Sequence, residues 1–213
     1  MTTYTHINAP TQFVDAADIR FAFRRFGKQT GIPLVLLQHF TGNLDSWDPA
    51  VLDGFAKDRE IIIFNNRGIA STNGVVPTTY AEMAKDTEAF IDALGVKTID
   101  LLGFSMGGGI AQLVAQARPD LVRRLILVGT APRNGDGMQG LTPEAQAIFG
   151  KVRSVADEVW MDVFFTQTEK SQTAARKFLD RYRARTVNRD VNISDAVAPA
   201  QKAAIGELGP TQG

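Results

Sequence analysis

A serine between two glycines is the feature of this sequence that most directly suggests chemistry. The segment Gly103-Phe104-Ser105-Met106-Gly107 matches the pattern G-x-S-x-G. An apolar run precedes the serine and apolar residues at helical spacing follow it, which places Ser105 where a strand turns into a helix. A sharp turn there strains the serine backbone and packs only if the residues two positions away lack side chains. The pattern therefore predicts that Ser105 is a nucleophile.

The glycines after the serine support this interpretation. Gly107, Gly108 and Gly109 follow in one run, and each costs about 1 kcal/mol relative to alanine inside a helix. Such a run indicates that another backbone packs closely against the helix. Because the Met106 N–H lies at the start of that helix, it can help to hold a negatively charged oxygen. The alternative is a glycine-rich turn that contains an incidental serine.

A serine hydroxyl is a poor nucleophile unless a neighbouring base takes its proton. The chain contains two histidines, His6 and His39, and both precede Ser105. His6 lies in a polar N-terminal segment and is expected to be exposed. The chain has no cysteine, so thiol catalysis, disulfides and cysteine-bound metals are excluded. We predict no cofactor and no metal site.

Strands and helices that could position the serine alternate along the chain. An alternating apolar pattern predicts a half-exposed strand at 19–27. Continuous apolar runs predict buried strands at 32–40, 60–68, 98–104 and 122–132. Helical spacing lies between them, at 44–58, 78–96 and 107–119. This order predicts an α/β fold with a mostly parallel sheet flanked by helices.

The pattern changes after Pro132. Helical segments follow one another with no strand between them, at 142–165, 170–187 and 195–209. We therefore predict two regions, a core at 1–133 and a helical cap at 134–213.

Taken together, these segments resemble the α/β-hydrolase family, in particular its small esterase and cofactor-free haloperoxidase-like members. The elbow GFSMGG is typical of that family, LLQHFTGNLDSWDP resembles its segment after the third strand, and FNNRGIASTNG resembles its segment after the fourth. The resemblance runs from about Phe21 to Pro132 and continues more loosely through the cap. Phe40 stands where the family usually has glycine, Asn65 where it has aspartate and Ala70 where it has a second glycine.

The resemblance implies roles for several residues. The backbone N–H groups of Phe40 and Met106 would form the oxyanion hole, and His39 would belong to the oxyanion loop rather than to the catalytic triad. The substrate pocket is predicted from these two regions and the cap, at His39, Phe40, Trp160 and Phe164. The alternative for the cap aromatics is that they pack the cap on the core.

The family places an acid and then a histidine after the serine, and no histidine follows Ser105. The acids that follow it, Asp190 among them, are expected on solvated helix faces. We therefore predict that the C-terminal strands of the family are absent, and that the strand at 122–132 becomes an exposed edge. Such an edge would pair with a complementary C-terminal polypeptide or a second copy of the chain.

The predicted function is that of a serine hydrolase for small ester-type substrates, weak or inactive as this chain alone. The alternative is a non-catalytic hydrolase-like protein that binds ligands or is a remnant. A Rossmann-type nucleotide site is disfavoured because the glycines are not spaced as G-x-G-x-x-G after the first strand. With 23 basic and 23 acidic residues, no nucleic-acid or membrane partner is expected. The absence of a signal-like or membrane-spanning segment predicts a cytoplasmic protein.

Overall fold

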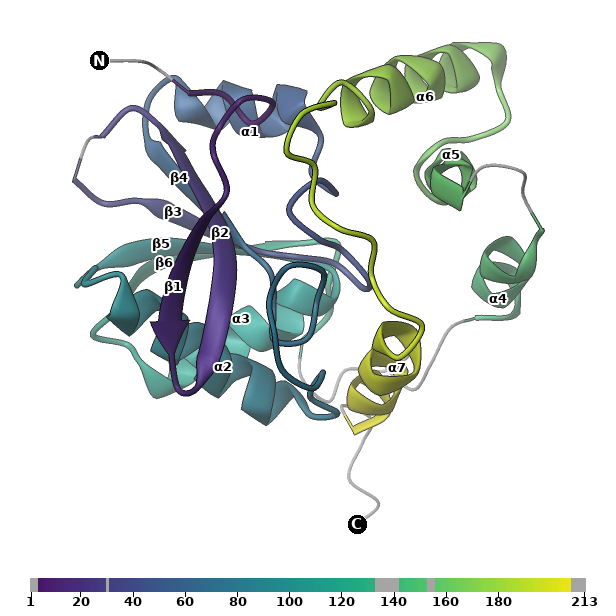
Figure 1. Ribbon diagram of the computed structural model, residues 1–213. Coiled ribbons are helices and arrows are strands. Elements are labelled where there is room, and N and C mark those ends of the chain that lie inside the picture. Colours follow the sequence, from purple (N-terminus) through teal and green to yellow (C-terminus); the bar gives the residue numbers. More distant parts are fainter. Residues whose placement is uncertain (1–3, 30, 133–141, 153–155, 208–213) are drawn as a thin grey trace.

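The computed structural model describes residues 4–29, 31–132, 142–152 and 156–207, and it shows a six-stranded sheet with helices on both faces (Figure 1). The strands in chain order are β1 (Gln12–Ala16), β2 (Ile19–Gly27), β3 (Leu34–Leu37), β4 (Glu60–Phe64), β5 (Ile99–Phe104) and β6 (Val122–Val128). In space their order is β1-β2-β4-β3-β5-β6. The pairs among β4, β3, β5 and β6 are parallel, whereas β1 and β2 are antiparallel to their neighbours. The predicted fold class is confirmed.

The apolar runs become central strands because both faces of the sheet are covered. Val35 and Leu37 of β3 point into the core cluster under one set of helices, and Leu34 and Leu36 point into the cluster on the other side. Successive side chains of a strand alternate between faces, so a strand buried on both sides needs an apolar residue at every position. β4 follows the same rule, and all five of its residues are buried.

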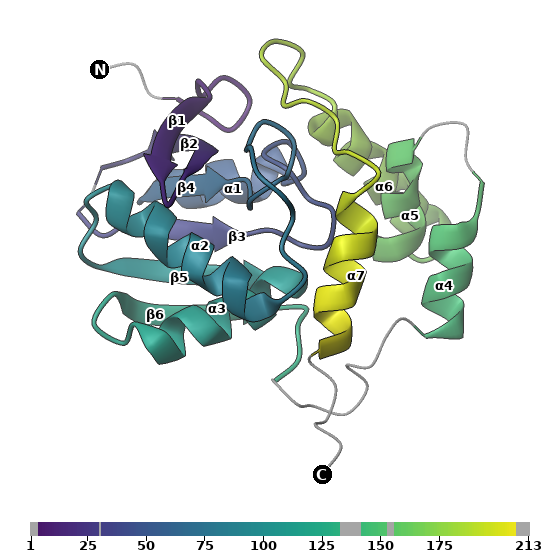
Figure 2. The ribbon, with the colours of Figure 1, turned by 60° about the horizontal axis from the view of Figure 1, so that its bottom comes forward.

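Helices α2 and α3 cover one face of the sheet, and α1 covers the other (Figure 2). Their bounds are α1 Pro49–Ala56, α2 Tyr80–Ala93 and α3 Met106–Ala117. α1 and α2 begin where the sequence offers a cap. The Asp48 side chain accepts from the Ala50 N–H, and the Thr79 side chain accepts from the Glu82 N–H.

The remaining helices lie beyond the sheet, at its carboxyl-terminal side (Figures 1 and 2). They are α4 (Pro143–Gly150), η1 (Ala156–Glu158), α5 (Val159–Phe164), α6 (Glu169–Tyr182) and α7 (Val197–Glu207). The predicted boundary at 133/134 lies outside the described residues. α7 packs on the sheet domain, because Ala204 belongs to the main core cluster and Val197 packs with Ile69 and Val76. No helix of the described part of the chain is long and apolar enough to cross a membrane.

The two edges of the sheet differ from the sequence-based expectations. β1 was not predicted, because its segment QFVDA has only a weak apolar pattern. By pairing with β2 it helps to bury that strand, which was expected to be half-exposed. The apolar run of β6 is typical of a buried strand, but the absence of further strands predicted that β6 would be an exposed edge. In the described residues β6 is an edge of the sheet. Leu125, Leu127 and Val128 are 37%, 43% and 44% exposed.

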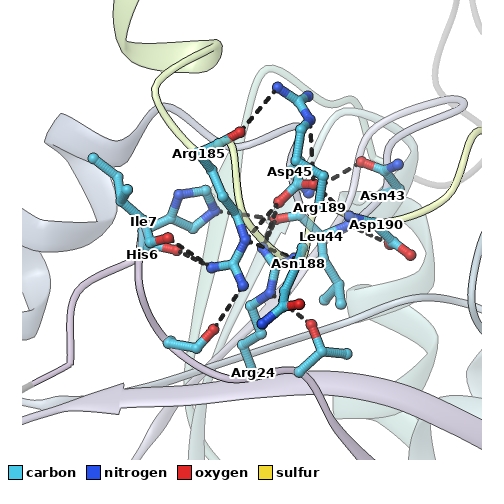
Figure 3. A network of polar contacts seen from close by, with 12 residues as sticks. His6, Ile7, Arg24, Asn43, Leu44, Asp45, Arg185, Asn188, Arg189 and Asp190 are labelled. Atoms are coloured by element: carbon cyan, nitrogen blue, oxygen red, sulfur yellow. Dashed lines mark hydrogen bonds and ion pairs between the residues drawn. The ribbon is translucent and has the colours of Figure 1, made fainter.

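A buried ionic network fixes the segment between α6 and α7, residues 183–196, which we call the strap (Figure 3). The Arg24 side chain is fully buried in β2 and donates to Asp45, which is 3% exposed. Arg185 of the strap, also 3% exposed, lies 3.8 Å from the same carboxylate. Its guanidinium donates to the carbonyls of His6, Ile7 and Ala9. One carboxylate thus balances two buried cations and ties the strap to the sheet domain.

His6 was expected to be exposed, and that expectation is wrong. The side chain is 2% exposed, and its Nε2 atom lies 3.0 Å from the Leu44 carbonyl. Its backbone N–H donates to Asp53 of α1. Burial lowers the pKa of the imidazole, which favours its neutral form. The N-terminal segment is therefore part of the packed structure around the strap.

We expect Asp45→Asn to lower the free energy of unfolding by about 3–5 kcal/mol, because Arg24 and Arg185 would remain buried without a counter-charge. Urea denaturation of the two proteins measures this difference. The matched control is Asp92→Asn, which removes a carboxylate that is 56% exposed and paired with Arg118. That change should leave stability nearly unchanged. Equal effects of the two substitutions would contradict the proposed role of Asp45.

Candidate active site

Ser105 lies at a sharp turn between the end of β5 and the start of α3. Its backbone has φ 53° and ψ −119°, a conformation that L-residues other than glycine rarely adopt. Strain of this kind costs about 1–3 kcal/mol and is concentrated at functional sites. The Ser105 N–H donates to the Val128 carbonyl at the end of β6, over 2.9 Å. The turn is thus held by the neighbouring strand, and the half-buried serine stands at the carboxyl end of the sheet.

The glycines on either side of the serine are required by contacts between backbones. A Cβ atom on Gly103 would lie 2.4 Å from the Gly107 carbonyl oxygen, and one on Gly107 would lie 2.4 Å from the Leu37 carbonyl oxygen. A Cβ atom on Gly108 would lie 2.4 Å from the side chain of Thr130. Real Cβ contacts are never this short, so α3 can approach β3 and β5 only with glycine at these positions. The steric reason given for the motif is confirmed.

The loop after β3 lies beside this turn. Leu37, the last residue of β3, is in register with Gly103 of β5. Phe40 follows three residues later and packs against the core cluster that contains Met106. Within the described part of the chain, no backbone carbonyl accepts from the Phe40 N–H. Met106 is the first residue of α3, where helix N–H groups have no carbonyl one turn before them. The two N–H groups predicted to hold an oxyanion are therefore on neighbouring elements.

His39 is a buried residue of the same loop. It is 7% exposed, and its Nδ1 atom donates to the Phe40 carbonyl over 2.8 Å. Burial is the largest influence on this imidazole and lowers its pKa. Its ring makes edge contacts with Phe104 and with Trp160 of α5. Its ring therefore binds the backbone of its own loop, and the lowered pKa favours the neutral imidazole.

Aromatic rings connect the cap helices to the serine turn. Trp160 stacks on Phe164 with ring centroids 5.6 Å apart, and Phe164 lies 6.1 Å from Phe104, the residue before Ser105. Of the four residues predicted to line the pocket, His39, Trp160 and Phe164 are linked through these rings, whereas Phe40 packs against the core cluster that contains Met106. Trp47, which was not predicted as a site residue, also contacts the Phe104 ring. Its Nε1 atom is buried and has no partner among the described residues.

One acid of the strap, Asp190, binds the loop that follows β4. One oxygen of Asp190 accepts from the Ser71 hydroxyl, and the other accepts from Asn65, which follows β4. Asp190 was expected on a solvated helix face, and that expectation is wrong, because the strap folds over the ends of the strands. The signal that could have found it is the polar segment NRDVN, which breaks the helical pattern.

The described residues contain no hydrogen-bonding base for the Ser105 hydroxyl and no group of three histidine or acidic residues that could hold a metal ion. The turn brings the Ser105 hydroxyl and the Met106 N–H to the start of α3. No side chain of the described residues is in hydrogen-bond contact with the Ser105 hydroxyl and able to accept its proton.

Fold, turn and glycine contacts together define a protein of the α/β-hydrolase class, and the chain belongs to that family. The family described as the alpha/beta hydrolase fold matches residues 32–183. A solved structure from Chitinophaga pinensis, described as an alpha/beta hydrolase fold protein, is 36% identical with a TM-score of 0.90, over 98% of this chain and 75% of that one.

Two curated relatives carry names that refer to an activity. BpoC of Mycobacterium tuberculosis, named for a non-heme bromoperoxidase, is 28% identical over 79% of this chain and 60% of its own length. The homoserine O-acetyltransferase of Deinococcus radiodurans is 26% identical over 75% of this chain and 54% of its own length. The chain thus spans between half and two thirds of these relatives.

We expect Gly107→Ala to lower the free energy of unfolding by about 1–3 kcal/mol, the usual cost of forcing atoms into a packed site. The added methyl group would meet the Leu37 and Gln38 carbonyl oxygens, and neither can move without shifting β3. The control is Gly54→Ala in α1, where the added methyl group meets nothing within 4 Å. That change should stabilise the protein by about 0.5–1 kcal/mol. Thermal or urea unfolding measures the change in the free energy of unfolding for both variants. No loss of stability in Gly107→Ala would contradict the close packing of α3 against β3.

Proposed function

We propose that this chain carries the nucleophile and the oxyanion hole of a serine hydrolase that acts on small ester-type substrates. The observation that supports this most is the strained backbone of Ser105, with φ 53°, at a turn whose glycines are in direct contact with other backbones. Strained backbone conformations of this kind are concentrated at functional sites. Here the fold holds the hydroxyl at the carboxyl end of the sheet, where α/β proteins bind their ligands.

The reaction follows from this arrangement. The Ser105 hydroxyl oxygen attacks the ester carbonyl carbon, and the carbonyl oxygen gains negative charge. The N–H groups of Phe40 and Met106 donate to that oxygen. Collapse of the intermediate breaks the ester C–O bond, releases the alcohol with a proton, and leaves an acyl group on Ser105. Water then attacks the acyl group, which releases the acid and restores the hydroxyl.

The aromatic residues beside the turn favour a small apolar acid part in the substrate. Phe104, Trp160 and Phe164 form a continuous apolar surface. One relative is named as a bromoperoxidase and another as an acetyltransferase, and these names describe the reactions of those proteins. Acetyl transfer proceeds through the same attack on an acyl carbon, which is why a small acyl group is the substrate class that we propose.

We expect the isolated chain to react slowly, because the described residues place no base beside Ser105. Without a triad histidine, only the residual rate from the oxyanion hole and binding remains, about 10³–10⁴-fold over water. The measurement is covalent labelling by a fluorophosphonate, together with hydrolysis of p-nitrophenyl acetate. Both should be weak in the wild type and absent in Ser105→Ala.

The matched control is Ser46→Ala, which removes a serine hydroxyl that is bound to Asn43 within the loop before α1. It should leave labelling as in the wild type. Labelling that persists in Ser105→Ala would contradict the assignment of the nucleophile. Complete absence of labelling in the wild type would instead favour a non-catalytic protein that binds ligands through the same fold.

We also propose that a further strand, from a complementary polypeptide or from a second copy of this chain, covers the β6 edge. Supporting this is the combination of an edge position with three apolar side chains that are 37–44% exposed. Edges of this kind pair readily with other strands.

We expect the chain alone to self-associate, and Leu127→Lys to shift it towards monomer because a charge on the edge disfavours strand pairing. Size-exclusion chromatography with light scattering measures the mass. Val75→Lys is the control, since Val75 is 83% exposed in a loop outside the sheet. A wild-type chain that is monomeric at high concentration would overturn self-association at this edge.

A further inference from the structure

The loop that carries Phe40 contains a strained turn. The Gly42 N–H donates to the His39 carbonyl over 3.1 Å, so residues 39–42 form a turn with Phe40 and Thr41 at its centre. Thr41 has φ 60°. A positive φ at the third position is what a type II turn requires, and glycine or asparagine is the usual residue there. Threonine is branched at Cβ and is unfavourable in this region.

The peptide between Phe40 and Thr41 is held at both ends. Its carbonyl oxygen accepts from His39 Nδ1 over 2.8 Å and from the Thr41 hydroxyl over 2.7 Å. Its N–H donates to Gln201 Oε1 over 2.7 Å. Type I and type II turns differ by a flip of this central peptide. All three hydrogen bonds favour the same orientation of the Phe40–Thr41 peptide. The hydrogen bond to the Thr41 N–H comes from Gln201 of α7, 160 residues away in sequence.

Gln201 is well placed to act in this way. Its side chain is 1% exposed, so the hydrogen bond to Thr41 is shielded from water. α7 is itself anchored, since Ala204 lies in the main core cluster and Val197 packs against Ile69. The packing of α7 therefore holds the Gln201 side chain in place against the loop.

We propose that Gln201 is a positioning residue for the proposed oxyanion hole: by binding the Thr41 N–H it fixes the central peptide of the turn, and with it the backbone of Phe40, whose own N–H lies in the preceding peptide. The proposal rests on the proposed function for its catalytic consequence, and on the hydrogen bond to Thr41 for its structural content. It makes α7 part of the active site, because the helix sets the geometry of a loop that precedes Ser105 by more than sixty residues.

The test compares Gln201→Met with Lys202→Met in the full chain. Methionine has the shape of glutamine and lacks its strong acceptor oxygen, whereas Lys202 is exposed on the same helix. Amide hydrogen exchange followed by NMR should show faster exchange at Thr41 in Gln201→Met, by about tenfold, the effect of losing about 1.4 kcal/mol of hydrogen bonding. Amides of α7 should exchange as before. Lys202→Met should change neither.

The second readout is the rate of Ser105 labelling. Gln201→Met should lower it by about the same tenfold factor without weakening binding of the probe. Adding Thr41→Gly to Gln201→Met should restore most of the rate, because glycine adopts a positive φ without strain. A role of Gln201 in general stability alone would not be relieved by a glycine in the loop.

The outcomes separate this proposal from the proposed function. Unchanged Thr41 exchange in Gln201→Met would overturn the proposal, whatever the reactivity of Ser105. Faster exchange with undiminished labelling would overturn its catalytic part. If the wild-type chain is not labelled at all, the hydrolase function fails, and the exchange experiment still decides whether Gln201 holds the loop.

Discussion

The close approach of α3 to the ends of β3 and β5 is the constraint on which the candidate site depends. The helix begins in contact with the Leu37 and Gln38 carbonyl oxygens, and only glycine at 103 and 107 permits this. The chain must turn within one residue to enter the helix, which places Ser105 at φ 53°. The strain is sustained because the parallel sheet and the helix over-determine the position of the turn. The same approach brings the start of α3 beside the loop that carries Phe40.

A second constraint holds the loops at this end of the sheet in place. The strap and α7 contribute polar side chains that bind loops of the sheet domain. Asp190 of the strap binds Ser71, and Gln201 of α7 binds Thr41. Both contacts join segments more than 100 residues apart in sequence. The fully buried Arg24 requires Asp45, and Asp45 in turn accepts from the strap. Removal of one partner from a buried pair of this kind leaves the other charge uncompensated, so the contacts of Asp45 fix the strap in one position.

Most of the sheet and the serine turn could be predicted from the sequence, because continuous apolar runs and the G-x-S-x-G spacing are local signals. β1 was missed, since an edge strand needs few apolar residues. Burial of His6 and the contact of Gln201 could not be predicted, and the polar segment around Asp190 indicates a break in the helix but not the partner of that carboxylate. Each depends on one polar partner far away in sequence, and a single polar residue carries no periodic pattern. The strap was expected to be helical in part, yet its polar residues bind loops instead.

The departure of Asn65 from the family pattern has a physical explanation in the strap. The Asn65 amide donates to Asp190 over 2.6 Å, in a site where Asn65 is fully buried. The aspartate usual at this position would place a second carboxylate against Asp190, and like charges at such a distance oppose each other's ionisation. An amide supplies a donor and carries no charge, so it binds the carboxylate without this cost. Asparagine at position 65 and the carboxylate of Asp190 therefore form one hydrogen bond between the motif after β4 and the strap. This bond allows the strap to lie over the end of β4.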